Sequence, residues 1–137
     1  MRKIVLISCV KTKLNHAALA KDLYVSQLFK SSLAYARSLN PDAIYILSAK
    51  YGVVKLDQEI EPYEMTLNKM PVDASKEWAK NVVIKLKEVA DLEKDKIIFI
   101  AGEKYRRFLI PHIRNYEIPL KGLSFGNQLK YMKAHTK

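Results

Sequence analysis

Three apolar runs, each broken abruptly by polar residues, constrain the fold of this chain more than any other feature. The runs cover 4–7, 44–47 and 97–100, and helical patterns lie between them. Apolar strands that alternate with helices are typical of an open, Rossmann-like sheet whose strands run mainly parallel and are covered on both faces. We therefore predict an α/β fold: a single three-layer domain over 1–137, with a mainly parallel sheet of three to five strands and helices on both faces.

Polar segments follow all three runs, at 8–13, 48–52 and 101–105. Ligands of open α/β sheets bind in the crevice outside the carboxyl ends of the strands. The predicted topology would gather these segments at one edge of the sheet, and we expect the functional site there.

The first polar segment combines a thiol, hydroxyl groups and two ammonium groups. Lys11 and Lys13 are suited to binding a phosphate or a carboxylate, although the segment lacks the glycines of a P-loop. Cys9 is a candidate nucleophile if a base such as His16 activates it. The alternative is a small buried side chain that packs at a strand end.

Aromatic and acidic residues follow the second run. Tyr51 is expected either to stack on a planar ring or to cover the sheet edge. The connection 50–71 shows no regular pattern, and connections of that length are usually functional. Within it, Asp57 and Glu64 are candidate acids or bases, with solvated loop carboxylates as the alternative.

The last third of the chain adds a third candidate group. Gly102, Glu103 and Tyr105 follow the third run, and Gly126 and Gln128 lie at the entry to a final helix. The N-terminus of that helix is suited to an anion. Gln128 would either read a base edge or cap the helix.

These residues fall into two predicted roles. The predicted catalytic residues are Cys9, Lys13, Lys50, Asp57 and Glu64. The predicted ligand-binding residues are Ser8, Lys11, Ser48, Tyr51, Gly52, Tyr63, Thr66, Gly102, Glu103, Tyr105, Gly126 and Gln128. Neither a metal site nor a cofactor is predicted, because the Cys and His residues lack the spacing of metal ligands.

Capping and helix-breaking residues predict the helix boundaries. Asp22 is expected to be the N-cap of a helix that ends before Pro41, or to lie in the approach to that helix. An amphipathic helix should open at Pro71, and Pro111 should bend or end another helix over 103–114. A short edge strand or extended connection then precedes the final helix.

The formal net charge of +10 favours anionic partners such as nucleic acid, nucleotides or anionic lipid. The lysines are scattered along the chain, so solvated helix faces are the alternative explanation. No apolar run approaches the roughly 20 residues of a membrane span, and no apolar leader precedes the first strand. We therefore expect a cytoplasmic protein without membrane contact.

Six short motifs resemble, in order, those of an uncharacterised bacterial and phage domain family of unknown function. They are Ser-Cys-x-Lys-x-Lys, Asp-Leu-Tyr-x-Ser-x-Leu-Phe, Leu-Ser-Ala-Lys-Tyr-Gly, Pro-Tyr-x-x-Thr-Leu, Ala-Gly-x-x-Tyr and Gly-x-Gln-Leu. That family is distantly similar to the YaaA-like peroxide-stress proteins and to the core domain of archaeosine synthase, which attaches lysine to a deazaguanine base in tRNA. The archaeosine synthase motif Pro-Cys-Ser-x-x-Lys-Pro-Tyr aligns with Cys9 and Lys13, whereas Val10 and Leu14 depart from it.

The resemblance implies a nucleotide or modified-base context. Our leading interpretation is an enzyme that acts on a nucleobase, a nucleotide or a modified base in nucleic acid, by group transfer or glycosidic-bond chemistry. One alternative is a non-catalytic nucleic-acid-binding stress or phage-related accessory protein, whose binding would weaken steeply as salt rises. Another is a scaffold or interaction module.

Overall fold

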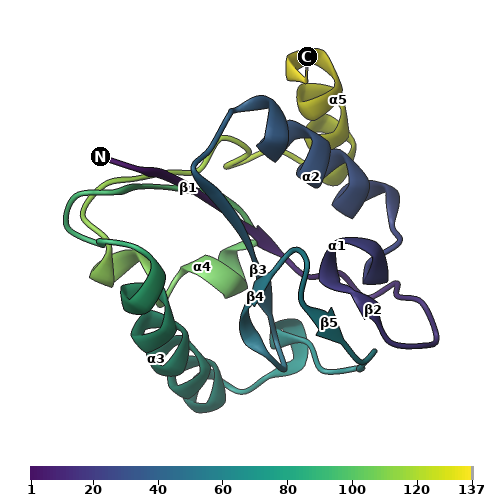
Figure 1. The fold of residues 1–137 in the computed structure, drawn as a ribbon, viewed down its shortest axis with the longest axis horizontal. Coiled ribbons are helices and arrows are strands. Elements are labelled where there is room, and N and C mark those ends of the chain that lie inside the picture. Colours follow the sequence, from purple (N-terminus) through teal and green to yellow (C-terminus); the bar gives the residue numbers. More distant parts are fainter. Residues whose placement is uncertain (137) are drawn as a thin grey trace.

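A mixed sheet of five strands forms the centre of the computed structural model, which describes residues 1–136 (Figure 1). The parallel strands β1 (Lys3–Ser8), β3 (Ala43–Ser48) and β6 (Lys96–Ile100) lie in the middle of the sheet. At its edges, β7 (Tyr116–Glu117) runs parallel to β6 and β4 (Gly52–Lys55) runs antiparallel to β3. The sheet is mainly parallel, as predicted, and the fold is of the α/β kind.

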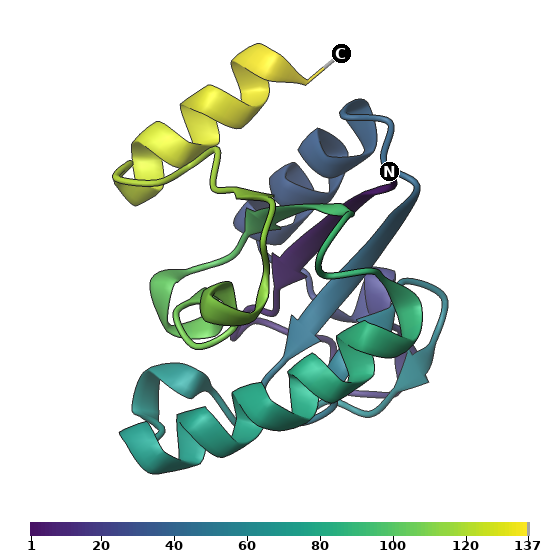
Figure 2. The same ribbon diagram turned by 90° about the vertical axis from the view of Figure 1, so that its left-hand side faces the viewer.

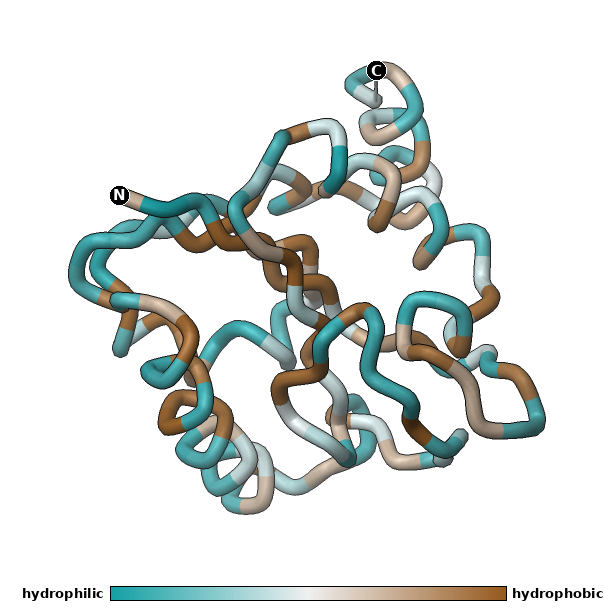
Figure 3. The backbone as a smooth tube through the Cα atoms, in the orientation of Figure 1, coloured by the Kyte–Doolittle hydropathy of each residue, from teal (hydrophilic) through white to brown (hydrophobic). Residues whose placement is uncertain are grey.

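The three apolar runs seen in the sequence are the three central strands. Ile4 to Ile7 of β1 are at most 1% exposed, and Ile97 to Ile100 of β6 are at most 4% exposed. A strand that is apolar at every position must be covered on both faces, which is the environment of a central parallel strand. The strong apolar colour along these strands is visible in Figure 3.

In the strand order β4-β3-β1-β6-β7, the chain adds strands first on one side of β1 and then on the other. From β1 the chain passes to β3 on one side, and from β3 it crosses to β6 on the other side. The carboxyl ends of β1 and β6 therefore lie side by side, with Ile7 paired to Ile100, while their following segments separate. Such a switch point leaves a crevice at the strand ends where ligands bind.

The first long helix, α2 (Gln27–Ser38), begins later than predicted. Its N-cap is Ser26, whose Oγ accepts a hydrogen bond from the Phe29 N–H at 3.1 Å. The prediction of Asp22 as the cap was wrong, because Asp22 belongs to the separate short helix α1 (Ala20–Leu23). Tyr24 interrupts the helical pattern, since its backbone is extended and bridges to Lys13.

The other long helices lie on different sides of the central strands. As predicted, α3 (Val72–Val89) opens directly after Pro71, and it packs against β4. The C-terminal helix α5 (Phe125–His135) packs against α2. Figures 1 and 2 show α3 on one side of β1 and β3, and the α2–α5 pair on the other. The complete three-layer order stays a prediction.

Pro111 shortens the helix expected over 103–114. The α-helical part, α4 (Glu103–Arg106), is followed by a separate 3-10 turn over Ile110–His112 that contains the proline. An edge strand is present as β7, just before the Ile118-Pro119-Leu120 stretch, for which the sequence predicts either an edge strand or an extended connection. Within 1–136, no helix is long and apolar enough to cross a membrane.

Short elements occupy stretches that show no periodicity in the sequence. The strands β2 (Ala18–Leu19) and β5 (Glu59–Ile60) pair antiparallel, and η1 (Leu67–Lys69) is a 3-10 turn. Such two-residue strands are too short for an alternating pattern, so only tertiary contacts define them. They hold the connection that follows β4 next to the segment that follows β1.

Candidate functional site

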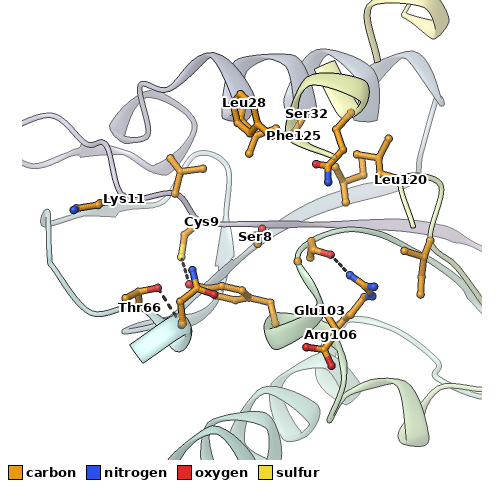
Figure 4. A pocket seen from close by; sticks show the side chains of 18 of the residues that line it. Ser8, Cys9, Lys11, Leu28, Ser32, Thr66, Glu103, Arg106, Leu120 and Phe125 are labelled. Atoms are coloured by element: carbon orange, nitrogen blue, oxygen red, sulfur yellow. Dashed lines mark hydrogen bonds between the residues drawn. The ribbon is translucent and has the colours of Figure 1, made fainter. Parts of the chain in front are cut away.

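A cavity of about 970 Å³ opens at the carboxyl ends of β1 and β6. Its wall includes Ser8 and Cys9 at the end of β1, and Ile100 and Ala101 at the end of β6. The cavity therefore occupies the switch point of the sheet, where open α/β folds bind their ligands. Figure 4 shows how segments far apart in the sequence meet around it.

Many of the predicted site residues lie together in this cavity. Those that line it are Ser8, Cys9, Lys11, Lys13, Tyr63, Glu64, Thr66, Gly102, Glu103, Tyr105 and Gln128. They come from the first polar segment, the third polar segment, the 62–67 motif and the final helix. The convergence expected from the strand ends thus holds for two of the three polar segments.

The second polar segment does not contribute to the cavity wall. Lys50 and Tyr51 lie in the tight turn between β3 and β4, and Gly52 begins β4 with a φ of +75°, which glycine adopts without strain. Asp57 is exposed in the turn after β4, and Gly126 is exposed on α5. The antiparallel hairpin carries the chain back along the sheet edge and away from the cavity.

Ser48 supports the site indirectly, through a chain of hydroxyl groups. Its Oγ donates to the Tyr63 Oη at 2.7 Å, and the Tyr63 Oη lies 2.7 Å from the Tyr24 Oη. Ser48 and Tyr24 are 0% and 1% exposed. Burial raises the pKa of Tyr24 to about 12 and also raises the pKa of Tyr63, so both phenols stay neutral at physiological pH. The chain fixes the Tyr63 ring in the cavity wall.

Cys9 lies within hydrogen-bond distance of a second buried phenol. The Cys9 thiol donates to the Tyr105 Oη at 3.3 Å, a bond drawn in Figure 4. The same oxygen accepts a hydrogen bond from the Leu67 N–H at 3.4 Å. Burial raises the pKa of Tyr105, so its neutral phenol is the form that holds the thiol and the 3-10 turn together. His16, the candidate base for activating Cys9, instead bonds to the Ala17 carbonyl.

Lys13 is the cation most closely built into the wall. Its Nζ lies 4.4 Å from the centre of the Tyr63 ring and donates to the Lys11 carbonyl oxygen at 3.2 Å. Partial burial lowers the pKa of Lys13, although the nearby carboxylate of Glu64 acts in the opposite direction.

Positive charge exceeds negative charge around the cavity. The basic residues in its wall are Lys11, Lys13, Lys69, Arg106 and Lys121, whereas the acidic ones are Glu64 and Glu103. Within residues 1–136, the salt bridges involve Lys85, Lys96 and Arg114, so none of the five basic side chains of the cavity forms one. Arg106 is held in place by a bond from its Nη1 to the Ala101 carbonyl at 2.8 Å. This arrangement is suited to an anionic ligand.

Several residues of the site were not predicted from the sequence. Tyr24 was part of the Asp-Leu-Tyr motif, and Arg106 directly follows Tyr105, so both had a recognisable neighbour in the sequence. Within 118–125 only Phe125 had such a neighbour, Gly126. This stretch supplies to the wall Ile118, Leu120, Lys121, Gly122, Leu123 and Phe125. Gln128 donates from Nε2 to the Leu123 carbonyl at 3.0 Å and thereby supports this stretch.

The described residues contain no group of three or more His, Cys, Asp or Glu side chains placed to hold a metal ion. The polar groups of the cavity are instead hydroxyl, ammonium, guanidinium and carboxylate groups. They are suited to binding an anion and to moving protons.

Comparison with known proteins places the chain at the level of a family. Among curated proteins, none matches this chain. A family described as a family of unknown function, DUF6884, matches residues 4–134. This confirms the expected membership of an uncharacterised domain family, while the distant likeness to YaaA-like proteins and to archaeosine synthase stays a prediction. Because the match covers nearly the whole chain, the protein belongs to the DUF6884 family.

Proposed function

We propose that this protein is an enzyme that acts on a nucleobase, a nucleotide or a modified base in nucleic acid, by group transfer or glycosidic-bond chemistry. The observation that carries the proposal is the cavity at the β1–β6 switch point, whose five basic side chains form no salt bridge within residues 1–136. Cations that face a concave site and form no salt bridge attract an anionic ligand, and phosphate is the anionic group of a nucleotide.

The proposal gives the cavity residues distinct roles. Lys11 binds the anionic group of the ligand as a point charge, because its side chain is exposed at the cavity wall. Lys13 contributes a second cation for the same anionic group, because its Nζ lies in the cavity wall, 4.4 Å from the centre of the Tyr63 ring. Glu64 lines the same cavity and is the candidate acid or base for proton transfer.

The position of the cavity also supports the finer structural descriptions of the protein. A ligand site at the switch point of a mainly parallel sheet is typical of Rossmann-like domains with three layers. The three-layer, Rossmann-like arrangement is therefore part of the proposal, whereas the YaaA-like description rests on the sequence motifs.

Thermal unfolding with candidate ligands tests the proposal. The panel contains nucleosides, nucleotides, deazaguanines, free amino acids and short oligonucleotides. A ligand at about 100 times its dissociation constant stabilises the fold by roughly 2.7 kcal/mol. We expect stabilisation by members of one small-molecule class, lost in Lys13→Ala and retained in Lys50→Ala. Lys50 is the matched control, because its Nζ also lies over a tyrosine ring, at 5.3 Å from the Tyr51 centroid, but outside the cavity.

A non-catalytic nucleic-acid-binding protein is the second candidate function, and the net charge of +10 favours it. Phosphate contacts release counterions, so binding would weaken steeply between about 50 and 200 mM salt. Stabilisation by oligonucleotides alone, with that salt dependence and equal losses in Lys13→Ala and Lys50→Ala, would contradict the cavity enzyme and support this alternative.

A further inference from the structure

Phe125 is an aromatic side chain that the fold itself does not require. It is 61% exposed, whereas Phe29 and Phe99 are 1% and 0% exposed in the core. Phe125 is the first residue of α5, and Ser124 already caps this helix by accepting a bond from the Asn127 N–H. Hydrophobic staples at helix starts join the residue before the cap to the fourth helical residue, so Phe125 has no place in such a contact either.

The exposed Phe125 ring lies in the cavity wall, where it can contact a ligand. Phe125 lines the cavity together with Leu28 of α2 and Leu123. Figure 4 shows the side chains of Phe125 and Leu28 on the helical side of the cavity, across from Cys9 and Thr66. Exposed apolar groups that border a cavity are typical of ligand contact surfaces.

The cavity therefore offers two different chemical environments. One is apolar and aromatic, at Phe125 and Leu28. The other is cationic, at the segment that follows β1, where Lys11 and Lys13 form no salt bridge within 1–136. A ligand that satisfies both environments carries a planar apolar face and an anionic group in one molecule.

We infer that Phe125 stacks on the heteroaromatic ring of a nucleotide whose phosphate binds Lys11 and Lys13, so that the site selects a nucleotide over a nucleoside or a free base. Aromatic side chains stack on any base through its π face, which suits this role. The inference deepens the proposed function and rests on it. Tyr51, for which stacking was expected from the sequence, lies outside the cavity wall.

Calorimetric titration with ligand fragments tests both halves of the inference. The probes are the four ribonucleoside monophosphates, the corresponding nucleosides and ribose 5-phosphate. Phe125→Ala should weaken nucleotide and nucleoside binding about 10-fold or more, as the loss of a stacking partner does, and leave ribose 5-phosphate binding unchanged. Lys13→Ala should show the reverse pattern, with weaker binding of ribose 5-phosphate and nucleotides and unchanged binding of nucleosides.

Two control variants make these results interpretable. Phe125→Tyr keeps an aromatic face and should bind like the wild type. Tyr116→Ala removes another exposed aromatic ring, 41% exposed and outside the cavity wall, and should also bind like the wild type. Because Phe125 contributes so little to the core, Phe125→Ala should keep the wild-type melting temperature.

Each outcome has a separate meaning. Equal nucleotide affinity of the wild type and Phe125→Ala would overturn the inference and leave the proposed function standing. Nucleosides that bind the wild type as tightly as nucleotides would overturn the selection for phosphate. If the wild type binds none of the probes, and none of the nucleobases and oligonucleotides of the wider panel, both the inference and the proposed function fall.

Discussion

The hydroxyl chain in the cavity wall predicts an unusual pair of mutational effects. Tyr63→Phe removes the oxygen that joins Ser48 to Tyr24, with both contacts at 2.7 Å. Ser48 Oγ still accepts hydrogen bonds from the Lys50 and Tyr51 N–H groups, so the main loss of hydrogen bonding falls on the Tyr24 hydroxyl. Tyr24 as a whole is 1% exposed, so its hydroxyl loses the Tyr63 partner at 2.7 Å with almost no access to water. An unsatisfied buried hydroxyl costs about 1–3 kcal/mol, so we expect a loss of about 2 kcal/mol.

Urea unfolding followed by tryptophan fluorescence measures this loss. The protein has one tryptophan, Trp78, whose indole N–H donates to the Ser48 carbonyl at 3.0 Å, so the probe lies next to the affected network. With an m-value of about 2 kcal/mol/M, the midpoint of Tyr63→Phe should fall by roughly 1 M while m stays constant. The melting temperature should fall by roughly 6 °C.

A second substitution decides whether the orphaned hydroxyl is the cause. In the wild type, Tyr24→Phe removes one hydrogen bond and should cost about 0.5–1.5 kcal/mol. In the Tyr63→Phe background, it removes the unsatisfied group and should be neutral or stabilising. If Tyr24→Phe destabilises both backgrounds equally, the reasoning is refuted, because the two hydroxyl groups then do not depend on each other.

Three further predictions concern pH and helix capping. Burial raises the pKa of Tyr24 to about 12, so the phenol ionises at lower pH in the unfolded chain than in the folded protein. The stability that the neutral phenol contributes is complete below pH ~10 and is lost as the pH rises through 12. Tyr24→Phe should therefore reduce the decline of the urea midpoint across that range. Two backbone N–H groups bond to the buried Asp95 carboxylate and hold its pKa below the usual range. Its contribution is present above pH ~4 and lost at lower pH, so Asp95→Asn should cost about 1.5–3 kcal/mol at pH 7 and progressively less as the pH falls below 4, measured by urea unfolding. Finally, Ser26→Ala removes the N-cap of α2 and should cost about 1 kcal/mol, measured by urea unfolding. Asp22→Ala should change stability by less than about 0.5 kcal/mol. A larger loss in Asp22→Ala than in Ser26→Ala would contradict the assignment of Ser26 as the cap.

Local sequence was sufficient wherever a residue's environment depends on its nearest neighbours. The continuous apolar runs at 4–7, 44–47 and 97–100 predicted the three central strands, because only a strand covered on both faces is apolar at every position. Pro71 likewise marked a helix start, and Pro111 marked a break in the helical pattern over 103–114, since proline restricts its own backbone. Cys9 and Tyr105 lie in one cavity, as expected from two polar segments at the ends of parallel strands.

Tertiary contacts decided the rest of the candidate site. Ser48 and Lys50 also follow an apolar strand, but the chain turns back into β4 there, so Lys50 faces solvent and Ser48 reaches the cavity only through Tyr63. The direction of a strand depends on its partner across the sheet, which no local pattern records.

The distinction is clearest in the cavity itself. The residue types at the strand ends alone indicated an anion-binding site on an α/β sheet, because lysines and hydroxyl groups carry that chemistry wherever they lie. Which side chains line the cavity depends on the packing of distant segments. Phe125 and Arg106 line it, whereas Asp57 does not. The physical reason is that the residue type alone fixes the functional groups of a side chain, whereas its neighbours in space depend on the fold of lowest free energy for the whole chain.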